Sequence, residues 1–93
     1  MARPIKPTLN RHQNTLRQAL GSVITELRIK RKWSQEDLGQ KAGYSVRYMI
    51  RVEKGQQNPS LDLLVVVAQV FGLSGSQLLA KAERKYLRNR IHP

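Results

Sequence analysis

The sequence of 93 residues has no cysteine, no long apolar run and few acidic residues. The lack of cysteine excludes a disulfide framework and a thiolate metal site, and it is compatible with a reducing cytosol. The longest wholly apolar run, Leu63–Ala68, is far shorter than the roughly 18 residues of a membrane span. The initial segment MARPIKPTLNRH lacks the apolar centre of a secretory signal, so we expect a cytoplasmic protein with no membrane partner.

Histidines and carboxylates are too sparse to form a recognisable catalytic or metal site. The two histidines, His12 and His92, lie near opposite ends of the sequence, and neither has an acidic neighbour. Five of the six acidic residues have a structural explanation from the sequence alone, in a first helical turn or on an exposed face near cations. No nucleophile and base pair, metal-ligand spacing or glycine-rich phosphate loop is present in the sequence. We therefore expect no enzymatic activity, no metal and no cofactor.

Positive charge dominates what is present, because 17 Lys and Arg residues against 6 Asp and Glu give a formal net charge of +11. Such an excess indicates the class of partner: nucleic acid is the first candidate and an acidic membrane surface the second. Membrane-surface binding has little support, because the basic residues 1–13 present no apolar helical face. The length fits one small domain, and a hydrophobic content of 40% supplies a modest core.

Apolar periodicity and capping residues predict five helices and no strand. Leu16, Leu20, Val23, Ile24 and Leu27 form one amphipathic stripe, which predicts a helix from about residue 14 to about residue 32. The other helices are predicted to begin after a serine that caps the free N–H groups of a first turn. They are predicted to end at a glycine, which adopts positive φ at little cost. These boundaries are Ser34 and Gly43, Ser45 and Gly55, Ser60 and Gly72, and Ser74 with a helix that extends towards Ile91.

Residues 33–60 are the most informative segment, because they predict two short helices joined by a tight glycine turn. Asp37 completes an S-x-x-D capping pattern with Ser34, and Trp33 and Leu38 form a hydrophobic staple across that cap. Gly43 ends the first of the two helices, and arginines follow on the second. This layout is that of a helix-turn-helix, which places its second helix in the major groove of DNA.

The segment resembles the Cro and phage-repressor type of helix-turn-helix protein, often called the XRE family. The residues that match its motif are Leu27-Arg28, Trp33-Ser34-Gln35-Glu36-Asp37-Leu38, Ala42-Gly43, Ser45, Met49, Val52-Glu53-Lys54-Gly55 and Asn58-Pro59-Ser60-Leu61. The resemblance covers roughly residues 20–79. It implies an all-α, five-helix, phage-repressor-like domain with the helix-turn-helix at its second and third helices. It also implies a dimeric transcriptional regulator from bacteria or phages.

Four positions depart from the family pattern, and the chain divides into three parts. Ile50 stands where the family commonly has a small polar residue. Gly39 stands where the family usually has alanine, and Leu63 and Val66 stand where relatives often have polar residues. We expect a basic amino-terminal arm over residues 1–13 and a helix-turn-helix domain over residues 14–80. Residues 81–93 are expected to form a basic extension of the last helix with a short tail.

The predicted recognition helix, residues 46–54, has one face for the core and one for DNA. Met49 and Val52 point towards the core. The predicted base contacts on the opposite face are Val46, Arg47, Ile50 and Arg51. Arginine can donate two hydrogen bonds to guanine, and aliphatic groups can pack against a thymine methyl. The alternatives are an ordinary solvated face for the two arginines, and packing against Tyr48 or a loop for Ile50.

Contacts with the DNA backbone are predicted on both sides of the recognition helix. The resemblance implies that Gln35 contacts a phosphate from the first turn of its helix, where free N–H groups and the helix dipole favour an anion. A surface glutamine is the alternative. The other predicted phosphate contacts are Ser45, Tyr48, Lys54, Gln56, Gln57 and Asn58. Half-buried packing is the alternative for Tyr48.

One charge pair is assigned to structure rather than to DNA binding. The resemblance implies that Arg28 and Glu53 form a partly buried ion pair that ties the first helix to the third. Arg28 is therefore a poor candidate for a DNA contact. The neighbouring cations Lys30, Arg31 and Lys32 are interpreted as a solvated helix end.

The predicted helix over residues 61–71 is apolar on nearly every side. We assign to the core Leu61, Leu64, Val65, Ala68 and Phe71. The remaining apolar stripe, together with part of the last helix, is the predicted dimer interface: Leu63, Val66, Val70, Tyr86 and Leu87. The alternative is that the tail folds back over this stripe within the same chain.

These observations predict a sequence-specific regulator that binds double-stranded DNA, most simply a repressor. It would act as a homodimer on a palindromic operator. The alternative is an antitoxin or adaptor whose main partner, such as a toxin, is another protein, with operator binding secondary. The apolar surplus of the helix over residues 61–71 and the basic tail would then contact that partner.

Overall fold

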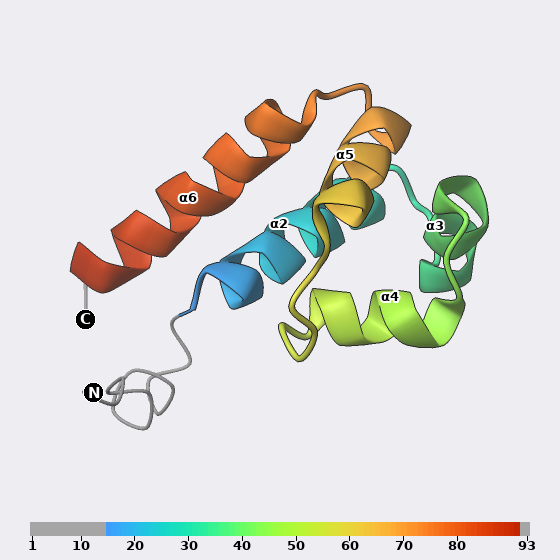
Figure 1. Cartoon of the computed structure of the whole chain (residues 1–93), viewed down its shortest axis with the longest axis horizontal. Helices are drawn as coiled ribbons and strands as arrows, with labels where there is room; N and C mark the ends of the chain where they lie inside the picture. Colours follow the sequence, from blue (N-terminus) through green and yellow to red (C-terminus); the bar gives the residue numbers. More distant parts are fainter. Residues whose placement is uncertain (1–14, 92–93) are drawn as a thin grey trace.

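This computed structural model describes residues 15–91 of the chain, with side chains for residues 15–89. Five helices with short links between them form this part. The helices are α2 (Leu16–Lys30), α3 (Gln35–Ala42), α4 (Val46–Glu53), α5 (Leu61–Val70) and α6 (Gly75–Ile91) (Figure 1). No strand occurs within residues 15–91, so the predicted all-α class is confirmed. The predicted arm over residues 1–13 lies outside the described residues, and the predicted boundary after residue 80 falls inside α6.

Polar side chains cap the helix starts as the sequence predicts. The Ser34 hydroxyl accepts a hydrogen bond from the Asp37 N–H at 2.9 Å, and the Asp37 carboxylate accepts from the Ser34 N–H at 2.8 Å. The hydroxyl groups of Ser45, Ser60 and Ser74 cap their helices in the same way. An additional capping box, formed by Thr15 and Gln18, starts α2 and was not predicted.

Left-handed residues end the helices. Gly43, Gly55 and Gly72 have φ values of 81°, 73° and 75°, which confirms the predicted glycine stops. At the end of α2 the same conformation falls on Lys32, with φ 61°. The Trp33 N–H then donates to the Arg28 carbonyl oxygen at 3.2 Å, which closes the turn that leads into α3. A side chain in this conformation costs roughly 1–2 kcal/mol, so the surrounding contacts must hold this link in place.

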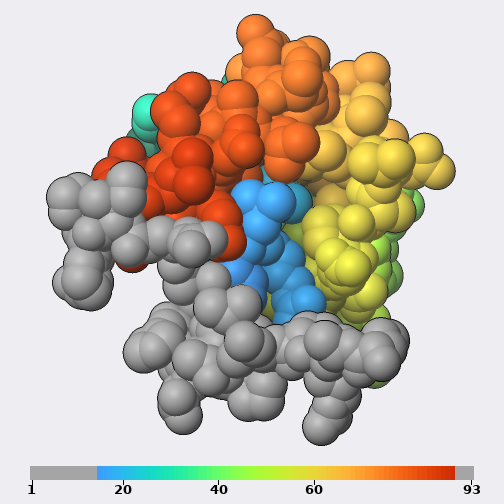
Figure 2. All heavy atoms as spheres, turned by 60° about the vertical axis from the view of Figure 1, so that its left-hand side comes forward, coloured from blue at the N-terminus to red at the C-terminus, as the bar shows by residue number. Residues whose placement is uncertain are grey.

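The core lies where all five helices meet, with α2 at its centre. α6 and α4 flank α2 on opposite sides (Figure 1), and Figure 2 shows a strip of α2 between α6 and the segment that links α4 to α5. The carboxy-terminal half of α6 lies along α2 rather than over the outer face of α5. The largest fully buried side chains are Ile24, Leu38, Met49, Leu63, Leu78, Val52 and Val67.

The buried face of α5 differs from the predicted one. Leu63 and Val67 are wholly buried, whereas Leu61 is 80% exposed and Val65 is 43% exposed. Leu61 and Val65 were therefore assigned to the core wrongly, and Leu63 cannot contribute to a dimer interface as predicted. The physical reason is that a helix with apolar residues on nearly every side has no hydrophobic periodicity. Its sequence therefore does not indicate which face is buried.

Two helix crossings depend on the absence of a side chain. A Cβ at Gly21 of α2 would lie 2.4 Å from the Glu53 carbonyl oxygen and 2.5 Å from that of Val52, so α4 packs directly on the α2 backbone. A Cβ at Gly39 of α3 would lie 2.7 Å from the Tyr44 carbonyl oxygen. The alanine that is usual at position 39 in the family would therefore require a shift of this turn.

A buried carboxylate joins three helices at the end of α4. Glu53 accepts hydrogen bonds from Arg28 Nε at 2.7 Å and Nη2 at 3.1 Å, and from the Gln35 amide nitrogen at 2.9 Å. Arg28 Nη1 also donates to the Trp33 carbonyl oxygen at 2.8 Å. Only 4% of the Glu53 side chain and 13% of the Arg28 side chain are exposed. The predicted structural ion pair of Arg28 and Glu53 is thus confirmed. Gln35 adds a hydrogen bond to its carboxylate.

Arg31 is exposed, in agreement with its interpretation as part of a solvated helix end, but its guanidinium group also makes contacts within the domain. Its guanidinium carbon lies 5.2 Å from the ring centre of Trp33 and 5.5 Å from that of Phe71. Arg31 Nη2 also donates to the Phe71 carbonyl oxygen at 3.1 Å. Trp33 and Phe71 stack with ring centres 5.5 Å apart, and Lys41 Nζ lies 4.8 Å from the Trp33 ring. Arg31 therefore connects the end of α2 to the end of α5.

The close contact at Gly21 predicts that Gly21→Ala lowers the free energy of unfolding. The added methyl group meets two backbone oxygens, which cannot rotate away, so we expect a loss of about 1–3 kcal/mol in urea unfolding. Gly75→Ala is the control, since its Cβ would meet the end of the Val65 side chain and alanine favours a helix. Equal losses in the two variants would contradict the proposed contact.

The buried position of Glu53 predicts that Arg28→Ala is strongly destabilising. The substitution leaves an unpaired carboxylate inside the protein, so we expect the free energy of unfolding to fall by about 3–5 kcal/mol. The double variant Arg28→Met/Glu53→Leu removes both charges and should recover a large part of this loss. A double variant as unstable as Arg28→Ala would show that packing, rather than the unpaired charge, is responsible.

Candidate nucleic-acid interface

The outer face of α4 exposes two arginines and one aliphatic side chain. Met49 and Val52 are buried, whereas Arg47, Arg51 and Val46 are exposed. Arg47 and Arg51 are one helical turn apart, so their side chains leave α4 on the same face. Neither arginine has an ion-pair partner among residues 15–89. This face can therefore present two free guanidinium groups to a partner.

The remaining side chains of α4 are partly engaged within the domain. Ile50, one turn after Val46, is half-buried. Tyr48 packs against the core, and its ring stacks on that of Tyr44 with centres 5.3 Å apart. This arrangement favours the half-buried alternative for the Tyr48 ring. Ser45 is exposed, and its hydroxyl oxygen accepts the hydrogen bond that caps α4.

A hydrogen bond from the Gln35 amide to the Glu53 carboxylate joins the start of α3 to the end of α4. The Gln35 amide uses one of its two hydrogens for this bond, so the other remains to donate to an anion. The first N–H groups of α3 also point out of the helix end without an intrahelical acceptor. Gln35 therefore combines a structural contact with the predicted backbone role.

Asp37 adds a negative charge at the same helix start. The Ser34 backbone N–H, and then the Ser34 hydroxyl, hold the pKa of the Asp37 carboxyl below its ordinary value, and the charge of Lys41 lowers it further. Asp37 thus stays ionised to lower pH than an isolated aspartate. A phosphate at this end of α3 must bind on the Gln35 side, away from that carboxylate.

The loop after α4 is held against α2. Lys54, Gln56 and Asn58 are exposed, and Gln57 is half-buried. The Arg17 Nε donates to the Gly55 carbonyl oxygen at 2.9 Å, which fixes the start of this loop. Sequence reasoning did not identify Arg17, because no local pattern relates it to a residue 38 positions away.

Other kinds of site are not found in the described part of the chain. Residues 15–91 contain no group of three or more His, Cys, Asp or Glu residues that could hold a metal ion. No single helix among these residues is long and apolar enough to cross a membrane. α5 and α6 reach that length and composition only together, and they are bent by 99° with respect to each other.

Known proteins resemble the chain in sequence. An uncharacterized HTH-type transcriptional regulator from Sinorhizobium fredii is 29% identical over 68 residues, which cover 73% of this chain and 88% of the relative. The immunity repressor protein of Bacillus phage phi105 is 36% identical over 70 residues, which cover 70% of this chain and 49% of the repressor. The chain therefore spans about half the length of the phage protein.

Solved structures share the fold. The clp gene regulator ClgR from Corynebacterium glutamicum superposes with a TM-score of 0.76 at 25% identity, over 83% of this chain and 82% of that one. A hypothetical transcription factor from Neisseria, NHTF, gives a TM-score of 0.66 at 31% identity, over 73% of this chain and 77% of that one. The five-helix arrangement is thus that of helical transcription regulators.

The family follows from these comparisons together with the geometry of α3 and α4. A family model described as helix-turn-helix matches residues 24–78, which is more than half of the chain and includes both helices and the loop after them. The matched proteins are transcriptional regulators rather than enzymes. The chain therefore belongs to the XRE type of the helix-turn-helix family, and it is a transcriptional regulator with a helix-turn-helix DNA-binding fold.

Proposed function

We propose that the chain is a sequence-specific repressor that binds a palindromic operator as a homodimer in the cytoplasm. The observation on which this depends is the exposed face of α4, where Arg47 and Arg51 have no ion-pair partner among the described residues and lie beside Val46. In the major groove, the two arginines donate to guanine, and Val46 packs against a thymine methyl. Ile50, being half-buried, contributes at the edge of this contact.

Backbone contacts on both sides of α4 position the helix in the groove. Gln35 donates to a phosphate from the start of α3, and the exposed Lys54 and Asn58 contact the backbone from the loop after α4. Gln56 is exposed as well and contacts the backbone from the same loop. Three further backbone contacts have weaker support, because their groups are partly engaged or half-buried: Ser45, Tyr48 and Gln57. These contacts set the orientation of the protein, whereas Arg47 and Arg51 determine the sequence that it prefers.

The repressor role and the homodimer rest on different arguments. The immunity repressor of a Bacillus phage is among the relatives, which supports repression as the mode of regulation. A homodimer is proposed because one α4 reads only a few base pairs. A two-fold pair places two recognition helices about 34 Å apart, one turn of DNA.

The surface proposed for dimerisation lies where α5 meets α6. Leu61, Val65 and Leu79 are 80%, 43% and 39% exposed, respectively. Leu61 precedes Val65 by one turn of α5, and the start of α6 at Gly75 lies against Val65, one turn before Leu79. These three side chains replace Leu63 in the proposed interface. Val66 and Val70 pack against the core, and only the exposed part of each remains for a partner.

The last turns of α6 fit the interface less well. Leu87 is 47% exposed and is available to a second chain, whereas Tyr86 is half-buried and not free. Both lie beyond the strip formed by Leu61, Val65 and Leu79. We therefore assign the main contact to that strip and a peripheral one to Leu87.

Base recognition by α4 predicts that Arg47→Ala and Arg51→Ala each weaken operator binding by about 1–3 kcal/mol. Affinity for scrambled DNA should change much less, because a base contact contributes little there. Gln35→Ala is the comparison and should weaken both complexes alike, since a phosphate contact contains no sequence information. Affinities would be measured on an operator obtained by selection from random duplexes. If the arginine variants lost affinity equally for the operator and for scrambled DNA, Arg47 and Arg51 would be phosphate contacts and not base contacts.

The exposed strip predicts that the wild-type chain sediments as a dimer at micromolar concentration and that Val65→Lys sediments as a monomer. A charge at the centre of the strip would be buried without a partner in the dimer. Ile29→Lys, at an exposed position near the end of α2, is the matched control and should remain dimeric. A monomeric wild type, or a dimeric Val65→Lys variant, would remove this surface from the proposal.

A further inference from the structure

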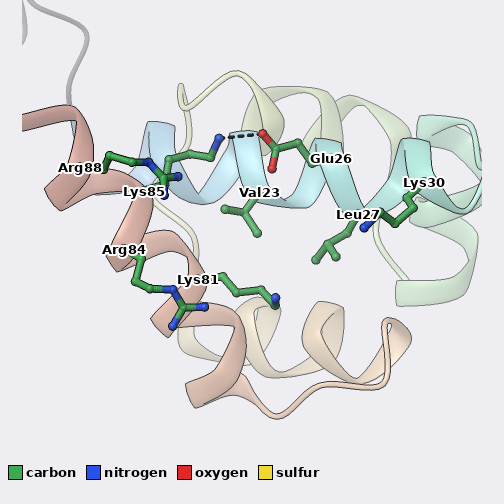
Figure 3. A pocket seen from close by; sticks show the side chains of 8 residues that line it. All are labelled: Val23, Glu26, Leu27, Lys30, Lys81, Arg84, Lys85 and Arg88. Carbon is green, nitrogen blue, oxygen red and sulfur yellow. Dashed lines mark hydrogen bonds and ion pairs between the residues drawn. The ribbon is translucent and has the colours of Figure 1, made fainter. Parts of the chain in front are cut away.

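A groove between α2 and α6 has no role in the proposed DNA complex. Its volume is about 230 Å³, and Val23 and Leu27 of α2 form its apolar floor. Figure 3 shows both side chains projecting from the same side of α2, with the Lys81 side chain extending from α6 into the space beside them and Arg84 lying along α6. The groove is thus a cleft with a small apolar floor and a charged rim.

The rim is almost entirely cationic. Lys30, Lys81, Arg84, Lys85 and Arg88 line the groove, and Glu26 is the one carboxylate among the lining residues. Glu26 is already paired with Lys85 at 2.7 Å. The other four cations have no ion-pair partner among residues 15–89. Their mutual repulsion is unfavourable in the free protein, so an anion in the groove would be stabilised by several charges at once.

The cations follow the length of α6 rather than a single point. Lys81, Arg84 and Arg88 recur three and four residues apart, so they lie on one face of α6. Seven residues of helix rise about 10 Å, which separates the outer two charges by that distance along the groove. A ligand that satisfies all of them must therefore contain several anionic groups over a comparable length.

The groove faces away from the DNA-binding surface. Positions 23, 26, 27 and 30 of α2 line the groove, whereas Gly21 and Arg28 of α2 contact α4. At about 100° per residue these two sets lie on opposite sides of α2, in agreement with the placement of α4 and α6 in Figure 1. DNA held by α4 would leave the groove accessible, so its occupant is a separate molecule.

The sequence argues against this chain as its own partner. Residues 1–14 and 90–93 contain no aspartate or glutamate, so neither segment can neutralise the rim. A second copy has 6 acidic against 17 basic residues, so it offers few carboxylates with which to neutralise the rim. Duplex DNA supplies phosphates, but its bases are stacked inside, and it has no apolar side chain to cover Val23 and Leu27.

We propose that this groove binds an acidic segment of another protein, in which carboxylates flank one or two large apolar side chains. The apolar side chains cover the floor formed by Val23 and Leu27, and the carboxylates pair with Lys30, Lys81, Arg84 and Arg88. Lys85 remains paired with Glu26 at the rim. The regulator would then hold its operator with α4 and a partner protein with the opposite side of α2.

The test uses a fluorescein-labelled synthetic peptide of glutamate and leucine, with the leucines three and four residues apart. A peptide with glutamine in place of glutamate is the ligand control. Fluorescence anisotropy at about 0.15 M salt should detect binding of the glutamate peptide alone. Lys81→Gln/Arg84→Gln should weaken this binding by about tenfold, whereas Lys32→Gln/Lys54→Gln, which has the same net charge, should change it by about twofold or less.

Three outcomes would overturn the proposal. The first is equal weakening by the two double variants, which would reduce the effect to net charge. The second is equal binding of the glutamate and glutamine peptides. The third is displacement of the peptide by a non-operator duplex, both from the wild type and from Arg47→Ala/Arg51→Ala, which would make the groove a second DNA site. Lys81→Gln/Arg84→Gln should still bind the operator and should have an unchanged circular dichroism spectrum. Loss of peptide binding in this variant would then be independent of folding and of the proposed DNA-binding function.

Discussion

The carboxylate of Glu53 fixes the relative positions of α2, α3 and α4, because this residue of α4 accepts hydrogen bonds from donors on the other two helices. Arg28 supplies two hydrogen bonds from α2, and Gln35 supplies one from α3. The direct contact of α4 with the backbone of α2 at Gly21 brings Glu53 close enough for these bonds. The angle at which α4 presents Arg47 and Arg51 therefore depends on a buried charge on the other side of the same helix.

This arrangement couples the two kinds of proposed DNA contact. Gln35 belongs to the proposed backbone contact, and its amide also donates to the residue that ends the recognition helix. A phosphate bound at Gln35 would thus be fixed relative to the bases that α4 reaches. Preorganisation of this sort reduces the conformational entropy lost on binding, since few side chains need to be ordered.

Sequence patterns predicted those features that depend on residues three or four positions apart. The serine caps of α3, α4, α5 and α6 and the glycine stops are of this kind, because each bond forms within one turn of its own helix. The exposed and buried faces of α4 followed from helical period for the same reason. The family resemblance supplied the pair of Arg28 and Glu53, which local patterns alone would not have shown.

Contacts between distant segments were not predicted, and neither was the orientation of α5. Arg31 reaches a carbonyl group 40 positions away, and no local pattern indicates such a bond. The buried face of α5 is decided by the helices that pack against it, chiefly α6 and α3, since its own sequence, LDLLVVVAQV, is apolar around most of the helix. The groove between α2 and α6 likewise requires two separate segments, each of which is unremarkable by itself.

The aromatic cluster at the end of α2 makes the protein suitable for a particular spectroscopic experiment. Trp33 is the single tryptophan of the sequence, and its ring contacts the cations of Arg31 and Lys41 and stacks on Phe71. Its fluorescence therefore reports on the junction of α2, α3 and α5 and is insensitive to the last turns of α6. Far-ultraviolet circular dichroism reports on all the helices together. Comparison of the two signals during unfolding distinguishes a cooperative transition from early fraying of α6.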